Sequence, residues 1–203
     1  SQQRRNRLGR AMVELVLLEF FGWHRVQSDP HFGNYRFRVG AAEDGSEDRI
    51  VLIDFGATRE FSNHFVRSYA QIVRGAVQRD RQQVLEGATA IGLMHDRFPE
   101  EVLAAFVRMC ELIVEPFVEH EKEATSAQLL NDRGEYCWGP SDLPKRVGNI
   151  TARNALSRYF RIPPREIVFL HRRLAGVFII CSVLGAEFNA RDALLEALAG
   201  VET

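Results

Sequence analysis

The sequence predicts a mainly α-helical chain that is interrupted by one β-hairpin. Apolar residues recur at helical spacing through most of residues 2–198. Capping residues, prolines and glycines separate these stretches. Strand patterning is confined to residues 35–53, where two short runs flank a polar loop. A chain of 203 residues can bury its own core, so we expect a single domain over residues 1–203.

Residues 2–21 are expected to form the first helix, which ends at Gly22. Residues 15–21 of this helix are all apolar except Glu19. That run is too short and too charged for a membrane span, which needs about 20 apolar residues. The pattern therefore indicates a buried helix that leads into the hairpin region.

The hairpin is predicted from two different strand patterns. Tyr35, Phe37 and Val39 alternate with two arginines, which is the period of a half-exposed strand. Residues 49–53 are mostly β-branched and apolar, as in a more buried strand. Residues 40–48 lie between the two runs and form a polar loop. The two strands are therefore expected to pair antiparallel.

The predicted register of this pairing brings polar side chains together. With Tyr35 opposite Ile53, Asn34 lies opposite Asp54. The hairpin would then deliver an amide oxygen and a carboxylate to one point, and Asp29 lies one short loop upstream.

These three polar residues have the spacing of a phosphoryl-transfer site. Asp29 and Asn34 stand in D-x-x-x-x-N spacing, and Asp54 opens a D-F-G triplet. In such sites the first Asp orients the attacking hydroxyl or water, while the Asn and the D-F-G Asp hold the magnesium ions that bridge the nucleotide phosphates. Mg²⁺ takes hard oxygen ligands of this kind. The alternative is a surface hairpin with ordinary turn acids, which would not explain the paired spacing.

Helices are expected to fill the rest of the chain, apart from a polar loop over residues 120–140. Ser62 and Asp80 are predicted N-caps, and Gly185 is predicted to end the longest helix. We expect these helices over residues 62–77, 80–92, from Pro99 to about Pro116, 141–159, 164–185 and 189–198. No A-P-E triplet follows the D-F-G, and little chain separates Gly56 from Ser62, so the peptide-seating segment of protein kinases is missing.

Composition excludes several other classes of function. The net charge is −1, so the composition does not favour electrostatic binding of nucleic acid. Cys110, Cys137 and Cys181 are the only cysteines and form no C-x-x-C pair. Neither a disulfide framework nor a zinc site is indicated, and a reducing compartment fits.

Three stretches resemble the UbiB/ADCK family of atypical kinase-like proteins, and the resemblance covers essentially the whole chain. The first is QSDPHFGN at residues 27–34, and the second is VLIDFGATREF at residues 51–61. The third is FLHRRLAGVFIICSVLGAEF at residues 169–188, which is similar to the last long helix of that family. The most specific part is the segment from Asp54 to Phe61.

The resemblance implies the larger, C-terminal lobe of a protein-kinase-like fold. It implies ATP and Mg²⁺ as cofactors, Asp29 as the catalytic residue, and Asn34 and Asp54 as the residues that bind nucleotide and metal. It also implies phosphoryl transfer or ATP hydrolysis that supports ubiquinone biosynthesis. The chain starts at Ser1 with no Gly- or Ala-rich phosphate loop before Asp29, so we expect the N-terminal lobe to lie upstream in cis. Residues 1–203 alone are then expected to be inactive.

The resemblance leaves partners and alternatives open. The expected partners are ATP, the N-terminal lobe, and quinone-biosynthesis proteins or a lipid membrane surface, with no nucleic acid. Localisation would be cytoplasmic or membrane-associated in a bacterium, and at the matrix side of the mitochondrial inner membrane in a eukaryote. One alternative function is a small-molecule kinase of the aminoglycoside or choline type. Another is a non-catalytic scaffold that binds nucleotide.

Overall fold

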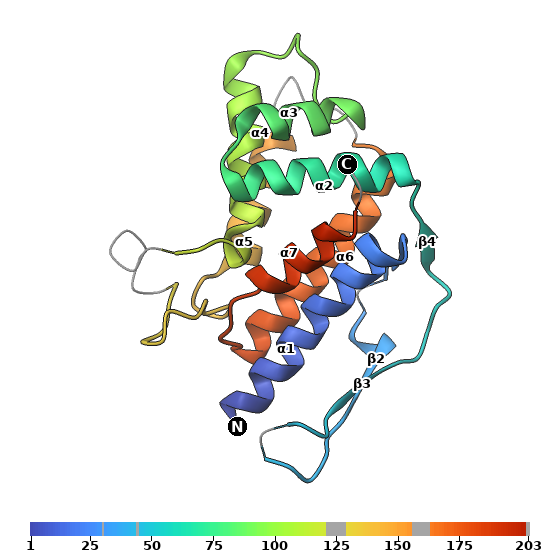
Figure 1. Cartoon of the computed structure of the whole chain (residues 1–203), viewed down its shortest axis with the longest axis vertical. Helices are drawn as coiled ribbons and strands as arrows, with labels where there is room; N and C mark the ends of the chain where they lie inside the picture. The colour runs from blue at the N-terminus through green and yellow to red at the C-terminus, as the bar shows by residue number, and fades with distance from the viewer. Residues whose placement is uncertain (30, 44, 121–128, 156–162, 202–203) are drawn as a thin grey trace.

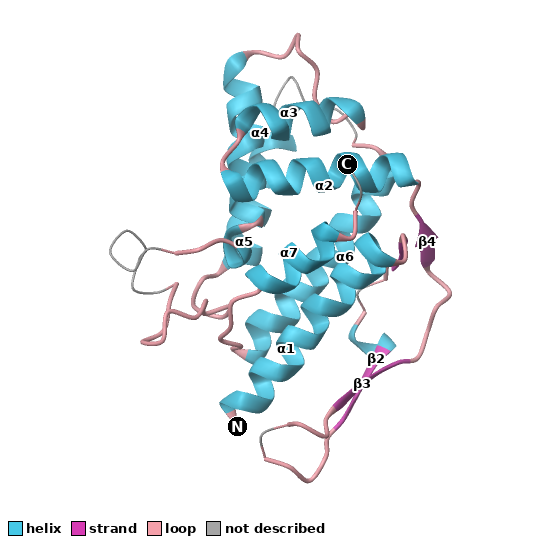
Figure 2. Cartoon of the chain, viewed as in Figure 1, coloured by secondary structure: helices cyan, strands magenta, loops and turns pink. Residues whose placement is uncertain are grey.

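The computed structural model describes residues 1–29, 31–43, 45–120, 129–155 and 163–201. The chain is mainly helical, as predicted, with two small two-stranded sheets (Figures 1 and 2). The α-helices are α1 (Gln2–Leu17), α2 (Asn63–Gln78), α3 (Arg81–Ala90), α4 (Glu100–Ile113), α5 (Leu143–Ala155), α6 (Arg165–Leu184) and α7 (Arg191–Ala199). The strands are β1 (Arg25–Gln27), β2 (Tyr35–Arg38), β3 (Arg49–Leu52) and β4 (Thr58–Glu60).

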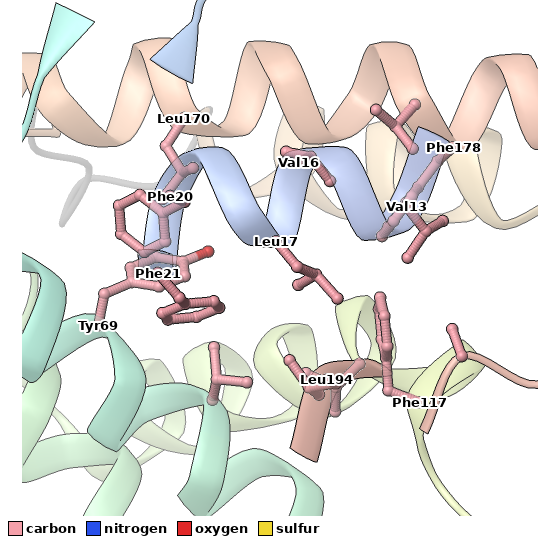
Figure 3. Close-up of a cluster of buried hydrophobic side chains, with 14 of the residues drawn as sticks. Val13, Val16, Leu17, Phe20, Phe21, Tyr69, Phe117, Leu170, Phe178 and Leu194 are labelled. Carbon is pink, nitrogen blue, oxygen red and sulfur yellow. The ribbon is translucent and has the colours of Figure 1, made fainter. Parts of the chain in front are cut away.

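The core lies where the first helix and the last two helices run side by side. Helices α6 and α7 both pack against α1, and α2, α3 and α4 pack together beside them (Figure 1). A π-helical turn over Leu18–Gly22 extends α1, so the predicted first helix ends at Gly22 as expected. Figure 3 shows Phe20 and Phe21, from this turn, pointing into a cluster of buried side chains from α1, α2, α6 and α7.

Local signals placed three helix ends correctly. The Ser62 hydroxyl accepts a hydrogen bond from the Phe65 amide at 3.2 Å, and the Asp80 carboxylate accepts one from the Gln83 amide at 3.1 Å. Gly185 ends α6 in the left-handed region, with φ of 57°. These caps satisfy backbone groups that the ends of a helix leave unpaired.

Helix α6 is long and apolar enough, by length and composition alone, to cross a membrane. Such a helix is equally typical of a protein core, and 44% of its apolar stretch is buried inside the protein. Its stripe of Leu170, Val177 and Cys181 is inaccessible to water and contributes to the core cluster. Burial within the protein accounts for this stripe, whereas Val168, Ile179 and Val183 of the same helix are exposed.

The prediction of a single hairpin was incomplete, because a second sheet joins β1 to β4. Arg25 pairs with Glu60, and Gln27 pairs with Thr58, in an antiparallel ladder. Each of these strands has only three residues, which is too short to show a two-residue period. Strand β1 precedes the β2–β3 hairpin and strand β4 follows it. Their pairing therefore brings the segment before Asp29 next to the segment after Asp54.

The predicted register of the hairpin was wrong by one residue. Tyr35 pairs with Leu52, and the Ile53 amide donates to the carbonyl of Asn34 at 3.0 Å. Asn34 therefore lies opposite Ile53 and not opposite Asp54. Directly opposed residues share a face, and Tyr35 is buried, so its partner must be the inward-facing Leu52.

The predicted polar loop over residues 120–140 is in part a folded, buried segment. Tyr136 and Trp138 are both almost inaccessible to water. The Tyr136 hydroxyl donates to the Glu115 carboxylate at 2.7 Å, and the Trp138 indole donates to the carbonyl of Phe188 at 3.3 Å. Residues 121–128 lie outside the described residues, as does the end of the helix expected over 141–159, beyond α5.

Candidate functional site

The two motif segments are held together by the buried side chain of Gln27. Its amide nitrogen donates to the carbonyl of Asp54, and its amide oxygen accepts from the Asp29 amide at 3.2 Å. Ser28 adds two contacts to Ala57, with its amide donating at 3.1 Å and its hydroxyl at 2.7 Å to the same carbonyl. The loop that carries Asp29 and the loop that carries Asp54 therefore form one structural unit.

Asp29 and Asn34, the two residues of the D-x-x-x-x-N motif, are in direct contact. The side-chain nitrogen of Asn34 donates to Oδ2 of Asp29 at 3.0 Å and to the Asp29 carbonyl at 3.3 Å. A 3₁₀ turn over Phe32–Asn34 returns the chain towards Asp29. Because the nitrogen of the Asn34 amide faces Asp29, its oxygen is the group that a cation would use.

Asp54 lies on the same loop unit, and its side chain is exposed. Its Oδ1 accepts a hydrogen bond from the Gly56 amide at 2.8 Å, which fixes the start of the turn after β3. The D-F-G carboxylate is thus anchored on one oxygen and faces solvent. The one-residue change in register sets Asn34 beside Ile53, so the backbone pairing does not place Asn34 and Asp54 opposite each other.

The donor set of Asn34 and Asp54 fits Mg²⁺ by its chemistry. It consists of one amide oxygen and one carboxylate, and magnesium is commonly held by one or two carboxylates together with substrate phosphates. Among the described residues there is no group of three or more His, Cys, Asp or Glu side chains that could hold a metal ion on its own. A site with few protein ligands is compatible with this result, because phosphate oxygens complete the coordination of magnesium in nucleotide sites.

A guanidinium from α6 also reaches the loop, and no sequence pattern had pointed to it. Nη2 of Arg172 lies 3.1 Å from Oδ1 of Asp29. These two residues are 143 positions apart in the chain. The only signal in the sequence was the charged group of His171, Arg172 and Arg173 inside an otherwise apolar helix.

The neighbouring arginine anchors α6 in the core behind the loop. Arg173 has no exposed surface, and its Nε lies 2.9 Å from the carboxylate of Glu19 on the π-helical turn. Arg173 also donates to the hydroxyl of Tyr35, the residue that follows Asn34. Burial raises the pKa of Glu19 above its ordinary value, and the positive charge of Arg173 acts in the opposite direction.

The N-terminal part of the chain matches a known protein family. Residues 1–88 match the ABC1 atypical kinase-like domain, and these residues include the whole loop unit around Asp29 and Asp54. This match, together with the relatives described next, confirms the resemblance to the ABC1/UbiB atypical kinase-like family seen in the sequence motifs.

Individual relatives match almost the whole chain and not only residues 1–88. The mitochondrial atypical kinase COQ8B of Rattus norvegicus is 29% identical over 192 residues, which is 95% of this chain and 33% of the rat protein. The mitochondrial atypical kinases COQ8 of Schizosaccharomyces pombe and Saccharomyces cerevisiae are each 26% identical, over 95% and 98% of this chain and 28% and 36% of their own lengths. The chain is thus similar to the COQ8 atypical kinases and spans about a third of their length.

Proposed function

We propose that this chain contributes the catalytic loop and the metal ligands to an atypical kinase or ATPase that binds ATP with Mg²⁺. The observation that carries the proposal is the contact between Asp29 and Asn34, on a loop that Gln27 joins to Asp54. Homology to atypical kinases supports nucleotide binding. The phosphoryl acceptor is either water or a second substrate.

Each of the three residues has a role that follows from its side chain. Asp29 would orient the attacking hydroxyl or water and accept its proton, because its carboxylate is partly exposed and already held in place. Asn34 and Asp54 would present oxygen atoms to Mg²⁺. When bound, the metal neutralises charge on the nucleotide phosphates. Gln27 keeps the two loops at a fixed separation, so the three groups act on one substrate.

We propose further that residues 1–203 form the larger, C-terminal lobe of a kinase-like fold, and that the phosphate-covering lobe is supplied elsewhere in the whole protein. The hairpin exposes apolar side chains beside the motifs, in Phe37, Val51, Ile53 and Phe55. Exposed apolar surface of this kind is typical of a docking site. The greater length of the matched relatives leaves room for such a lobe.

By homology, the process that this activity would support is ubiquinone biosynthesis. Partners would then be quinone-biosynthesis proteins or the membrane surface that carries their substrates. The relatives cited above are named as mitochondrial proteins. We propose the matrix side of the mitochondrial inner membrane for a eukaryotic source, and the cytoplasm or its membrane surface for a bacterial one.

A kinase for a small molecule is a second candidate, and one observation favours a small acceptor over a peptide. The segment between Gly56 and Ser62 forms strand β4, which pairs with β1. This segment is therefore committed to the sheet and leaves no long loop to seat a peptide.

The proposal is tested with the whole protein from which this chain comes. ATP binding is measured by calorimetry with Mg²⁺ and with excess EDTA, and phosphate release is measured under the same conditions. Magnesium-dependent binding with turnover supports an ATPase, and stimulation of turnover by a small hydroxyl compound supports the second candidate. Binding without turnover for any acceptor would leave only the nucleotide-binding scaffold, and absence of binding would exclude all three.

A further inference from the structure

The carboxylate of Asp29 is held on both of its oxygens. Asn34 donates to Oδ2 at 3.0 Å, and Arg172 meets Oδ1 at 3.1 Å. The Asn34 contact comes from the same loop, and the Arg172 contact comes from α6. A carboxylate held from two sides cannot rotate about its terminal bond without losing one contact.

The position of Arg172 is set by a rigid part of the core. The next residue, Arg173, is fully buried, and it is tied to Glu19 at 2.9 Å and stacked over the Tyr35 ring at 5.2 Å. These contacts fix α6 relative to the π-helical turn and to β2, the strand that starts directly after Asn34. Consecutive residues on a helix point in different directions. With Arg173 directed into the core, Arg172 emerges beside the loop that carries Asp29.

The pair of Arg172 and Asp29 contributes little to the stability of the fold. The two side chains are 59% and 36% exposed, and ion pairs of this kind contribute about 0 to 1 kcal/mol. The residue before Asp29 is Ser28, whose hydroxyl donates to the carbonyl of Ala57. Ser28 therefore supplies no positive charge to Asp29. The contact therefore has more consequence for the orientation of one carboxylate than for folding.

We propose that Arg172 is a positioning residue for the phosphoryl-transfer step, and that it acts by holding the Asp29 carboxylate in the orientation that accepts the acceptor's proton. This inference rests on the proposed function of Asp29. It adds a residue from helix α6 to a site whose other members lie between Gln27 and Asp54.

The first test is the Arg172→Ala variant of the whole protein, with turnover measured against ATP concentration. A misplaced catalytic group costs up to about 100-fold in rate, so we expect kcat to fall about 10- to 100-fold. The KM for ATP should stay within about twofold, because Arg172 is not assigned to nucleotide binding. Arg172→Lys should recover only part of the loss, because an ammonium lacks the planar fork of the guanidinium.

Chemical rescue separates positioning from a merely structural role. Millimolar guanidinium ion should restore part of the kcat of Arg172→Ala, because it can occupy the vacated place beside Oδ1 of Asp29. Arg165→Ala is the matched control, because it removes the same charge from the same helix, where the guanidinium stacks on the Phe169 ring 5.3 Å away. That control should keep wild-type kcat and show no response to guanidinium.

A double variant decides whether Arg172 acts through Asp29. With Asp29→Asn already in place, Arg172→Ala should lower kcat no further, since the group that it positions is gone. An additional loss in the double variant, or a wild-type kcat in Arg172→Ala, would overturn the inference and leave the role of Asp29 intact. Unchanged turnover in Asp29→Asn, or no turnover in the wild type, would overturn the proposed function and this inference together.

Discussion

Arg173 donates a hydrogen bond of 2.9 Å to the carboxylate of Glu19, and both side chains are buried. The pair connects α6 to the π-helical turn at the end of α1, two elements that are 154 residues apart at this point. Through its further contact with the Tyr35 hydroxyl, Arg173 also holds the first residue of β2. A buried ion pair thus connects α6 to the elements on either side of the loop that carries Asp29.

Breaking this pair on one side should destabilise the fold strongly. Arg173→Met leaves the Glu19 carboxylate buried without its partner, and the loss of one member of a buried pair costs about 3–5 kcal/mol. Urea unfolding of the chain, followed by circular dichroism, measures the change in the free energy of unfolding. The double variant Glu19→Leu with Arg173→Met removes both charges and should recover much of the loss. A cost below about 1 kcal/mol in Arg173→Met would contradict the role given to this pair.

Asp29→Asn should separate chemistry from binding. The substitution keeps the size of the side chain and its ability to accept from Arg172, but it removes the proton acceptor. We expect turnover of the whole protein to fall about 10²- to 10⁴-fold, as for a lost general base, while the Kd for MgATP stays close to that of the wild type. Asp192→Asn, on α7, is the matched control for the loss of a carboxylate. If the affinity for MgATP collapses together with turnover, Asp29 is a metal ligand or a folding residue.

Asp54→Asn should weaken the magnesium-dependent binding of nucleotide. Its carboxylate is anchored at one oxygen by the Gly56 amide and is otherwise open to solvent. Magnesium prefers carboxylate oxygen to amide oxygen, so the variant should need a higher Mg²⁺ concentration to reach the same affinity for ATP. Calorimetric titration with ATP at a series of Mg²⁺ concentrations gives this shift. An identical magnesium dependence in wild type and variant would remove Asp54 from the site.

A histidine in α6 should make the stability of the fold depend on pH. The Tyr69 hydroxyl lies 3.0 Å from Nε2 of His171, and burial lowers the pKa of His171 from 6.5 to about 4. Burial raises the pKa of Tyr69, so its hydroxyl stays protonated and donates to the neutral imidazole. The unfolded chain therefore binds a proton more readily than the folded chain between these two pH values.

The expected result is a loss of stability as the pH falls from about 6.5 towards about 4, with the full contribution of His171 present above this window. His171→Gln keeps a hydrogen-bond acceptor for Tyr69 but does not titrate, so its stability should decline less over the same range. Urea unfolding of both proteins at pH 7, 6 and 5 measures the difference. Parallel pH profiles would show that His171 is not the titrating group.

Residues 1–203 alone should bind MgATP weakly and turn it over negligibly. The site offers a nucleotide two carboxylates and an amide, and Arg172 is engaged with Asp29. Phosphoryl transfer depends on positioning and on charge stabilisation, which the proposed phosphate-covering lobe would supply. The apolar side chains exposed on the hairpin should also promote self-association.

Calorimetry with MgATP and analytical ultracentrifugation of the isolated chain measure these two expectations. Phe55→Ser with Ile53→Thr should reduce self-association without a large change in stability, because both side chains are exposed. Tight, stoichiometric binding of MgATP would show that the chain needs no second lobe.

Local features of the chain could be predicted from sequence because they depend on neighbouring residues. The caps at Ser62 and Asp80 and the stop at Gly185 each follow from the chemistry of one residue and the turn beside it. The contact between Asp29 and Asn34 also spans only five positions. The motif spacing was therefore enough to bring these two residues together.

The register of the β2–β3 hairpin could not be predicted from the local apolar pattern. Residues 50–53 are all apolar, so they fit either face of the strand, and their sequence alone does not choose between two registers. Burial of Tyr35 opposite Leu52 made the choice. The described residues 129–140 contain no named helix or strand, as the polar composition of residues 120–140 indicated, but the burial of Tyr136 and Trp138 depends on their contacts with Glu115 and Phe188.

The sequence by itself indicated the family that the chain resembles, the order of its helices and the three motif residues, because these depend on residue type and short spacing. Only the tertiary structure decided the pairing of β1 with β4, the burial of Arg173 against Glu19 and the approach of Arg172 to Asp29. Each of these contacts joins segments that are distant in the chain. Their partners are selected by the packing of whole helices, and that packing leaves no periodic signal at the residues involved.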